Sequence, residues 1–212
     1  MQKNYTQNSQ LPIMKLLNPK YLIASLAIFC CLSIQKAKAQ VNTQDSLALV
    51  DLYDSTGGAN WKNCIPWKLS KPVSQWNGIT ILGGRVTSIV LKTLGLRGSI
   101  PPSIGNLTKL TTLNLWFNSL NNSIPTSIGN LKSLTTLDLS VNQLTGAIPS
   151  SIGNLTNLTL LDLSQNKLSD SIPTSLGNLN NLTDLELWRN KLSGPIPSTL
   201  GNLSSAPIPF ST

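Results

Sequence analysis

Leucines recur along most of the chain with a period of 24 residues. Within one unit, Leu110 to Ser133, leucines first alternate with polar residues, as in a short strand with one buried face. Two leucine phases return in the later units: Leu113, Leu137, Leu161 and Leu185, then Leu115, Leu139, Leu163 and Leu187. A constant period of this length predicts a solenoid whose units stack their strands into a parallel sheet. No unit can cover its own apolar face, so about three or more must stabilise one another.

An asparagine follows the second leucine phase in every unit but the first, where Leu94 takes its place. A buried amide at an inward turn can bond its own turn and the backbone of a neighbouring unit. Leu94 would then mark the unit that has no predecessor to bond. We therefore predict a structural asparagine ladder made of Asn118, Asn142, Asn166 and Asn190.

Two further phases predict how each unit turns back. Four residues after the asparagine phase come residues that tolerate positive φ, namely Gly98, Asn122, Gly146, Asp170 and Gly194. An Ile-Pro step follows in each unit, for example Ile124-Pro125. Proline fixes φ and removes a hydrogen-bond donor, so we expect an extended return path rather than a full helix on the convex side.

Together these phases resemble the leucine-rich repeat of plant receptor-like proteins, which also occurs in secreted bacterial proteins. The motif LxxLxLxxNxLxGxIPxxIGNL runs through five units from about Val86 to Leu203. The resemblance implies an α/β repeat solenoid, a horseshoe or superhelix whose concave parallel sheet binds partners. Plant members usually carry a cysteine pair in the N-terminal cap. This chain lacks such a pair, which favours a secreted bacterial member.

The first 39 residues are typical of a secretory signal. Met1 to Ala39 contain five lysines and no acid, an apolar run over Tyr21–Ile34, and Ala37-Lys38-Ala39 before Gln40. A membrane anchor is the alternative, but the run is shorter than the ~20 residues that a spanning helix needs. We expect residues 1–39 to be a signal peptide and the mature chain to be secreted, outside the cell or at its surface, with no stable membrane span.

Residues 40–85 are predicted to form an N-terminal cap of a helix and a hairpin. Thr43 or Asp45 is expected to cap a short helix over residues 46–53. Gly83-Gly84 separates two strand-like runs and predicts a tight hairpin that leads into the first unit. The tryptophans of this segment are expected to pack over the end of the solenoid: Trp61, Trp67 and Trp76.

The five repeats, over residues 86–205, are followed by a tail, 206–212, in which the leucine pattern fails. Its prolines, Pro207 and Pro209, would blunt an edge strand, and a truncated chain is the alternative. Only Cys64 remains in the mature chain, so the thiol is either buried or free for an intermolecular bond. Self-association through Cys64 or the C-terminal edge stays open as an alternative.

Charge and residue types argue against several functions. The chain carries a net charge of +8, but loss of the five signal lysines leaves a scattered +3, which argues against nucleic-acid binding. The chain has no histidine, which removes the usual general base, histidine triads and most zinc sites. Asp138, Asp162 and Glu186 form one column, but an exposed column lacks the cleft of a two-carboxylate glycosidase. We predict no enzymatic activity, no cofactor and no metal site.

Units differ most at the two positions after the second leucine phase. There, strand alternation turns Trp116 and Trp188 outward on the concave sheet, about 14 Å apart over three strand steps. Aromatic residues and arginine are enriched in binding hot spots, although each ring could instead simply lie over its neighbours. We predict that Trp116, Phe117, Trp188 and Arg189 anchor a ligand and that Asn114, Asp138, Asp162 and Glu186 supply polar selectivity.

The sequence thus predicts an extracellular, non-catalytic recognition module for a protein, peptide or glycan. An inhibitor of a cell-wall-degrading enzyme is one alternative, because an acidic concave face would suit a basic enzyme. A structural fragment of a larger surface protein is another. Ice binding is a weaker alternative suggested by a column of threonines in register: Thr87, Thr111, Thr135, Thr159 and Thr183.

Overall fold

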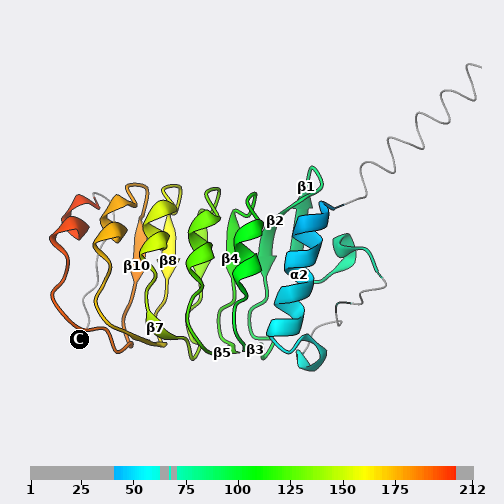
Figure 1. Cartoon of the computed structure of the whole chain (residues 1–212), viewed down its shortest axis with the longest axis horizontal. Helices are drawn as coiled ribbons and strands as arrows, with labels where there is room; N and C mark the ends of the chain where they lie inside the picture. Colours follow the sequence, from blue (N-terminus) through cyan, green and yellow to red (C-terminus); the bar gives the residue numbers. More distant parts are fainter. Residues whose placement is uncertain (1–40, 63–66, 68–70, 204–212) are drawn as a thin grey trace, which may run out of the picture. The chain divides into compact units, whose positions relative to one another are not determined.

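The computed structural model describes residues 41–62, 67 and 71–203 (Figure 1). The predictions for the signal peptide, Cys64 and the tail fall outside these residues. Inside them, strands follow one another along a stack, and short helices cover the side opposite the main sheet (Figure 1).

The main sheet has six strands in the order β1-β2-β4-β6-β8-β10. Strands β1 and β2 form the predicted antiparallel hairpin, and both Gly83 and Gly84 have positive φ. The remaining pairs are parallel, and each residue faces the one 24 positions on, as Leu113 faces Leu137. The strand bounds are β1 Ile79–Leu82, β2 Arg85–Val90, β4 Thr112–Asn114, β6 Thr136–Asp138, β8 Leu160–Asp162 and β10 Asp184–Glu186. The predicted α/β repeat solenoid is confirmed.

Both leucine phases point into the core, which is continuous along the stack. Leu113 and Leu115 are fully buried, whereas in the last unit Leu187 is only half-buried. On the side of the stack, two-stranded ladders join neighbouring units. They pair β3 (Arg97–Gly98) with β5 (Ser119–Leu120) and β7 (Thr145–Ala147) with β9 (Lys167–Ser169).

Each unit returns through an extended proline and then a five-residue 3-10 helix. The predicted extended path is therefore correct at the prolines, such as Pro125 with φ −68° and ψ 139°, and the helical turn follows it. These helices are η3 Pro102–Asn106, η4 Thr126–Asn130, η5 Ser150–Asn154, η6 Thr174–Asn178 and η7 Ser198–Asn202. We call the surface they form the helix face.

Left-handed backbone occurs at the predicted phase in all five units, with φ between 62° and 103°. The structure adds a second left-handed column that residue types did not predict: Thr93, Phe117, Val141, Gln165 and Arg189. Backbone bonds between adjacent units hold this column, as when Phe117 N donates to Ser140 O. The fold, not the side chain, therefore sets this conformation.

The asparagine phase makes a repeated set of hydrogen bonds. Asn142 Nδ2 donates to Leu115 O of the preceding unit and to Leu139 O of its own turn, at 3.0 and 3.1 Å. Asn142 Oδ1 accepts from Leu120 N at 3.0 Å. Asn118, Asn166 and Asn190 repeat the pattern.

We predict that Asn142→Ala lowers the free energy of unfolding by about 1–3 kcal/mol, because it leaves buried backbone groups of two units unpaired. Urea denaturation measures this loss. Asn130→Ala is the matched control, because Asn130 is exposed and its side chain bonds no described residue. Equal midpoints for the two variants would contradict a stabilising role for the ladder.

The N-terminal helix α2 spans Thr43–Ser55, and its cap differs from the prediction. Asn42, not Thr43 or Asp45, is the cap, since its Oδ1 accepts from Gln44 N and Asp45 N. A cap must precede the first helical residue, and the helix starts three residues earlier than expected. Asp45 instead turns inward and is fully buried.

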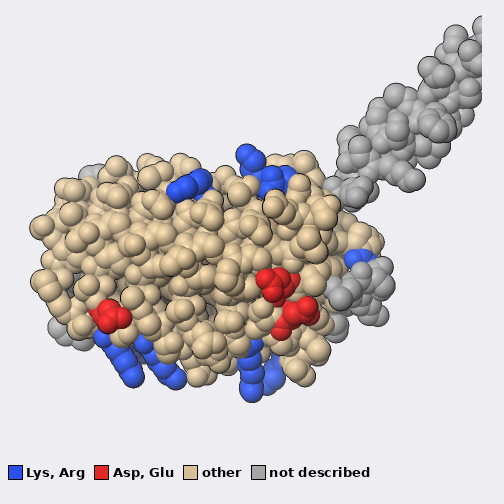
Figure 2. All heavy atoms as spheres, in the orientation of Figure 1, with Lys and Arg blue, Asp and Glu red and all other residues tan. Residues whose placement is uncertain are grey.

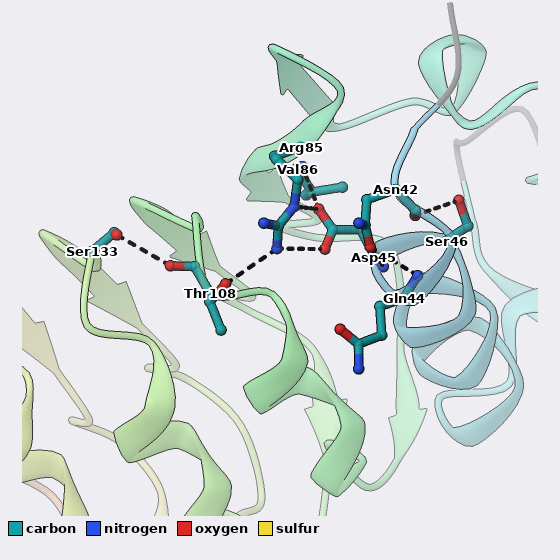
Figure 3. A network of polar contacts seen from close by, with 8 residues as sticks. All are labelled: Asn42, Gln44, Asp45, Ser46, Arg85, Val86, Thr108 and Ser133. Atoms are coloured by element: carbon teal, nitrogen blue, oxygen red, sulfur yellow. Dashed lines mark hydrogen bonds and ion pairs between the residues drawn. The ribbon is translucent and has the colours of Figure 1, made fainter. Parts of the chain in front are cut away.

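Asp45 joins α2 to the hairpin (Figure 3). Its carboxylate accepts from Arg85 Nε and Nη2, both at 3.0 Å, and from Val86 N at 2.8 Å. Arg85 Nη2 also donates to Thr108 Oγ1 in the next unit. The hydrogen bond to Asp45 raises the pKa of Arg85 above its usual value despite an opposing effect of burial, so the guanidinium stays charged.

The three cap tryptophans are buried, as expected for packing residues. Trp67 stacks on Trp76 with ring centroids 4.7 Å apart and meets Trp61 edge-on at 4.9 Å. Each indole N–H donates to a backbone carbonyl nearby. The short helices η1 (Gly58–Asn60) and η2 (Val73–Gln75) complete this region.

Candidate functional site

The outward-facing side of the main sheet, which we call the sheet face, is arranged in columns with one residue from each unit. One column reads Val90, Asn114, Asp138, Asp162 and Glu186, and the next reads Lys92, Trp116, Ser140, Ser164 and Trp188. The left-handed column, which includes Phe117 and Arg189, lies beside the second. All eight predicted ligand-binding residues thus belong to three neighbouring columns.

Trp116 and Phe117 form the exposed aromatic pair of this face. Their side chains are 37% and 55% exposed, and their ring centroids lie 5.4 Å apart. Asn114 fixes the turn below them, because Asn114 Oδ1 accepts from Trp116 N at 3.0 Å. Both rings therefore keep part of their surface open to a partner.

Trp188 and Arg189 are arranged differently. Trp188 is half-buried, and Arg189 Cζ lies 5.2 Å from the centroid of its ring. The ring is therefore partly covered by its own neighbour, in a cation–π contact. The alternative in which a ring lies over its neighbours thus describes Trp188 beside Arg189 as well as Trp116 beside Phe117.

Carboxylates of the acidic column make hydrogen bonds within their own turns. Asp138 Oδ1 accepts from Ser140 N and Oγ, and Asp162 Oδ1 accepts from Ser164 N. Asn114 Nδ2 donates to the other oxygen, Asp138 Oδ2, at 3.0 Å. Among the described residues Glu186 has no such bond, and its side chain is half-buried.

The described part of the chain contains neither a candidate metal site nor a candidate membrane-spanning helix. That part contains no His or Cys, and its Asp and Glu side chains form no group of three that could hold a metal ion. None of its helices combines the length and the apolar character required to cross a bilayer.

A shallow groove of about 760 Å³ lies elsewhere, where the outer helices end. It is lined by Lys132, Gly153, Asn154, Thr156, Gly177, Asn178, Asn180 and Asn202. Sequence reasoning missed this site. Its sequence signals are the asparagine of the recurring Gly-Asn-Leu step, which also occurs outside the groove, and Asn180, which stands where earlier units have Thr108, Lys132 and Thr156.

A family model described as "Leucine-rich repeat region" matches residues 97–205. The chain belongs to this leucine-rich repeat family. A probable inactive receptor kinase of Arabidopsis thaliana is 35% identical over 106 residues, which cover 48% of this leucine-rich repeat chain and 16% of that protein. The chain thus spans less than a fifth of this relative's length.

Solved structures agree with this family. A chain in the BIR3–SERK2 complex of Arabidopsis thaliana is 36% identical, with a TM-score of 0.65, and the match covers 76% of this chain and 92% of that one. A plant ice-binding protein is 34% identical, with a TM-score of 0.67 and coverage of 77% and 54%. These relatives are plant proteins, which does not support the assignment to a bacterial member.

Proposed function

We propose that this leucine-rich repeat protein is an extracellular, non-catalytic recognition module that binds a protein or peptide on its sheet face. The observation that carries the proposal is the exposed aromatic pair Trp116 and Phe117. Exposed aromatic side chains beside polar groups are typical of binding hot spots. The similarity to a chain of the BIR3–SERK2 complex supports a protein partner.

Trp188 and Arg189 would extend the contact to the far end of the face, about 14 Å away. Between the two tryptophans their column carries only Ser140 and Ser164, whose small side chains are buried. A ligand lying across the units would contact both aromatic groups, because the buried serine side chains between them do not obstruct it. Asn114, Asp138, Asp162 and Glu186 would contact its polar groups.

The acidic residues favour a partner with a basic surface. Asp184 lies on the same strand as Glu186 and adds a further exposed carboxylate. Inhibition of a basic cell-wall-degrading enzyme is one form that such binding could take. A glycan partner and self-association remain further proposals for the same chain.

The test compares wild-type mature chain with the double variant Trp116→Ala/Trp188→Ala against an arrayed panel of secreted proteins and peptides. We expect the variant to lose about 30-fold or more in affinity, since hot-spot residues contribute at least ~2 kcal/mol. Thr126→Ala/Ser150→Ala on the helix face is the control and should bind as wild type. Full binding by the tryptophan variant would refute a site on the sheet face.

Ice binding is a second candidate, favoured by the similarity to a plant ice-binding protein and by the threonine column. Each hydroxyl donates to the carbonyl of the preceding threonine, as Thr135 Oγ1 does to Thr111 O at 3.0 Å. The ladder is regular, but the adjacent column changes to Leu160 and Asp184, which interrupts a flat ice-like lattice. We expect no thermal hysteresis from the pure protein, and a clear hysteresis gap would make this candidate the leading one.

A further inference from the structure

The groove on the helix side offers a second binding site, separate from the sheet face. It follows the ends of three consecutive outer helices, η5, η6 and η7, and the turns that lead from them. Its volume of about 760 Å³ is within the usual range for ligand sites of roughly 300–1,000 Å³. Its residues come from different columns than Trp116 and Trp188, so the two sites are independent.

Side-chain amides dominate the groove. Asn178 and Asn180 are exposed, and their side chains make no hydrogen bond to any other described residue. Neighbouring asparagines differ in this respect, since Asn157 and Asn181 donate to carbonyls of the preceding units, both at 2.8 Å. The groove asparagines therefore retain two donors and one acceptor each for a ligand.

The scarcity of charged residues around the groove limits the class of ligand that it would bind. The five outer helices contain no charged residue, and the surface over them is tan in Figure 2, with blue Lys and Arg along the upper and lower edges and red Asp and Glu over α2 and at the lower edge. Lys132 is the one charged residue that lines the groove, and its Nζ already donates to Asn154 O at 3.3 Å. A site of neutral amides suits a ligand that both donates and accepts hydrogen bonds without carrying charge.

The groove is built on rigid backbone. A Cβ atom on Gly153 would lie 2.3 Å from Ser175 O, and one on Gly177 would lie 2.4 Å from Thr199 O. These close approaches lock the spacing of η5, η6 and η7. The amides of successive units are therefore presented at a repeating interval, which matches a polymer of repeating units better than an irregular ligand.

We propose that this groove binds an oligosaccharide, with the Asn178 and Asn180 amides hydrogen-bonding hydroxyls of one sugar ring and the amides of Asn154 and Asn202, in the neighbouring units, those of the adjoining rings. Sugar hydroxyls donate and accept at adjacent positions, as do these amides. The groove has no aromatic side chain to stack on a sugar ring, so hydrogen bonds provide the recognition.

The test is a titration of ¹⁵N-labelled mature chain with a neutral hexasaccharide of β-1,4-linked glucose and, separately, with a hexamer of galacturonate. Asparagine side-chain NH₂ resonances report binding directly. We expect the Asn178 and Asn180 signals to shift with the neutral sugar, and Asn178→Ala/Asn180→Ala to weaken binding at least tenfold. Because both side chains are exposed and unbonded, this variant should fold normally.

The control matched to Asn178 is Asn106→Ala/Asn130→Ala, which removes two exposed asparagines at the equivalent Gly-Asn-Leu position outside the groove. It should bind as wild type, and so should Trp116→Ala/Trp188→Ala. A response to galacturonate alone that Lys132→Gln abolishes would assign the groove to acidic sugars. No shift with either sugar, shifts with a neutral peptide instead, or equal losses in both asparagine variants would overturn the proposal.

Discussion

Asp45→Ala is expected to lower the free energy of unfolding by about 3 kcal/mol. The carboxylate is fully buried and holds Arg85 through two hydrogen bonds and Val86 N through a third. Its removal leaves a guanidinium without a partner and a buried amide unpaired, and breaking a buried ion pair costs about 3–5 kcal/mol. The Arg85 side chain is 27% exposed, so water should offset part of this loss and place it at the lower end.

Urea denaturation of residues 40–212 measures the effect, with Asp54→Asn on the same helix as control. Asp54 is exposed, and its side chain bonds no described residue. Because each unit of a solenoid contacts only its neighbours, the loss should appear first as exposure of the cap. An early shift of tryptophan emission to longer wavelength, as expected when the buried Trp61, Trp67 and Trp76 meet water, would report it. A midpoint equal to that of the control would show that Asp45 does not hold α2 to the hairpin.

Gly153→Ala is expected to destabilise the protein by a similar amount, about 3 kcal/mol. The added Cβ would lie 2.3 Å from Ser175 O, 2.6 Å from Ser175 Cβ and 2.7 Å from Ser175 C. The first and last of these atoms belong to the backbone and cannot turn aside as a long side chain would. Overpacking of this kind typically costs 1–3 kcal/mol, and the backbone clash places it at the upper end.

Gly201→Ala is the matched control, because Gly201 occupies the same phase in the last unit. A Cβ there meets no described atom within 4 Å. The variant should be as stable as wild type, since no described unit packs against it. Equal destabilisation by both substitutions would place the effect in the local conformation of the helix rather than in the packing between units.

Features set by the period were predictable from the sequence. Leucine spacing specifies the parallel register, because every unit must present the same apolar face to the next. The left-handed turn at Asn122 and Asp170 was also predictable, because these residue types tolerate positive φ. In these places local preference and the repeated fold agree.

Other features depend on tertiary contacts that carry no local signal. Val141 is a β-branched residue, which disfavours positive φ, yet it has φ 54° because backbone bonds to the next unit hold it there. Asp45 is a common helix-capping type, and only the position of Arg85, 40 residues away, explains its burial. The groove was missed because the Asn of the Gly-Asn-Leu step is the same inside the groove and outside it, and Asn180 alone does not indicate a groove.

The candidate site was predictable in part. Alternation along the strand places Trp116 on the sheet face, but alternation does not predict the exposed fraction of its side chain. Trp188 occupies the same column and is half-buried, with Arg189 over its ring. Asp138 also looks like a free carboxylate in the sequence, yet one of its oxygens accepts from Ser140.

Photo-crosslinking from single positions tests the central claim that partners bind the sheet face. A photoreactive phenylalanine analogue replaces Gln165, which lies between the two tryptophans, or Asn130 on the helix face outside the amide groove. The probe is a partner taken from the secreted-protein and peptide panel. We expect a crosslink from position 165 and none from position 130, and a crosslink from position 130 alone would show that partners do not bind the sheet face.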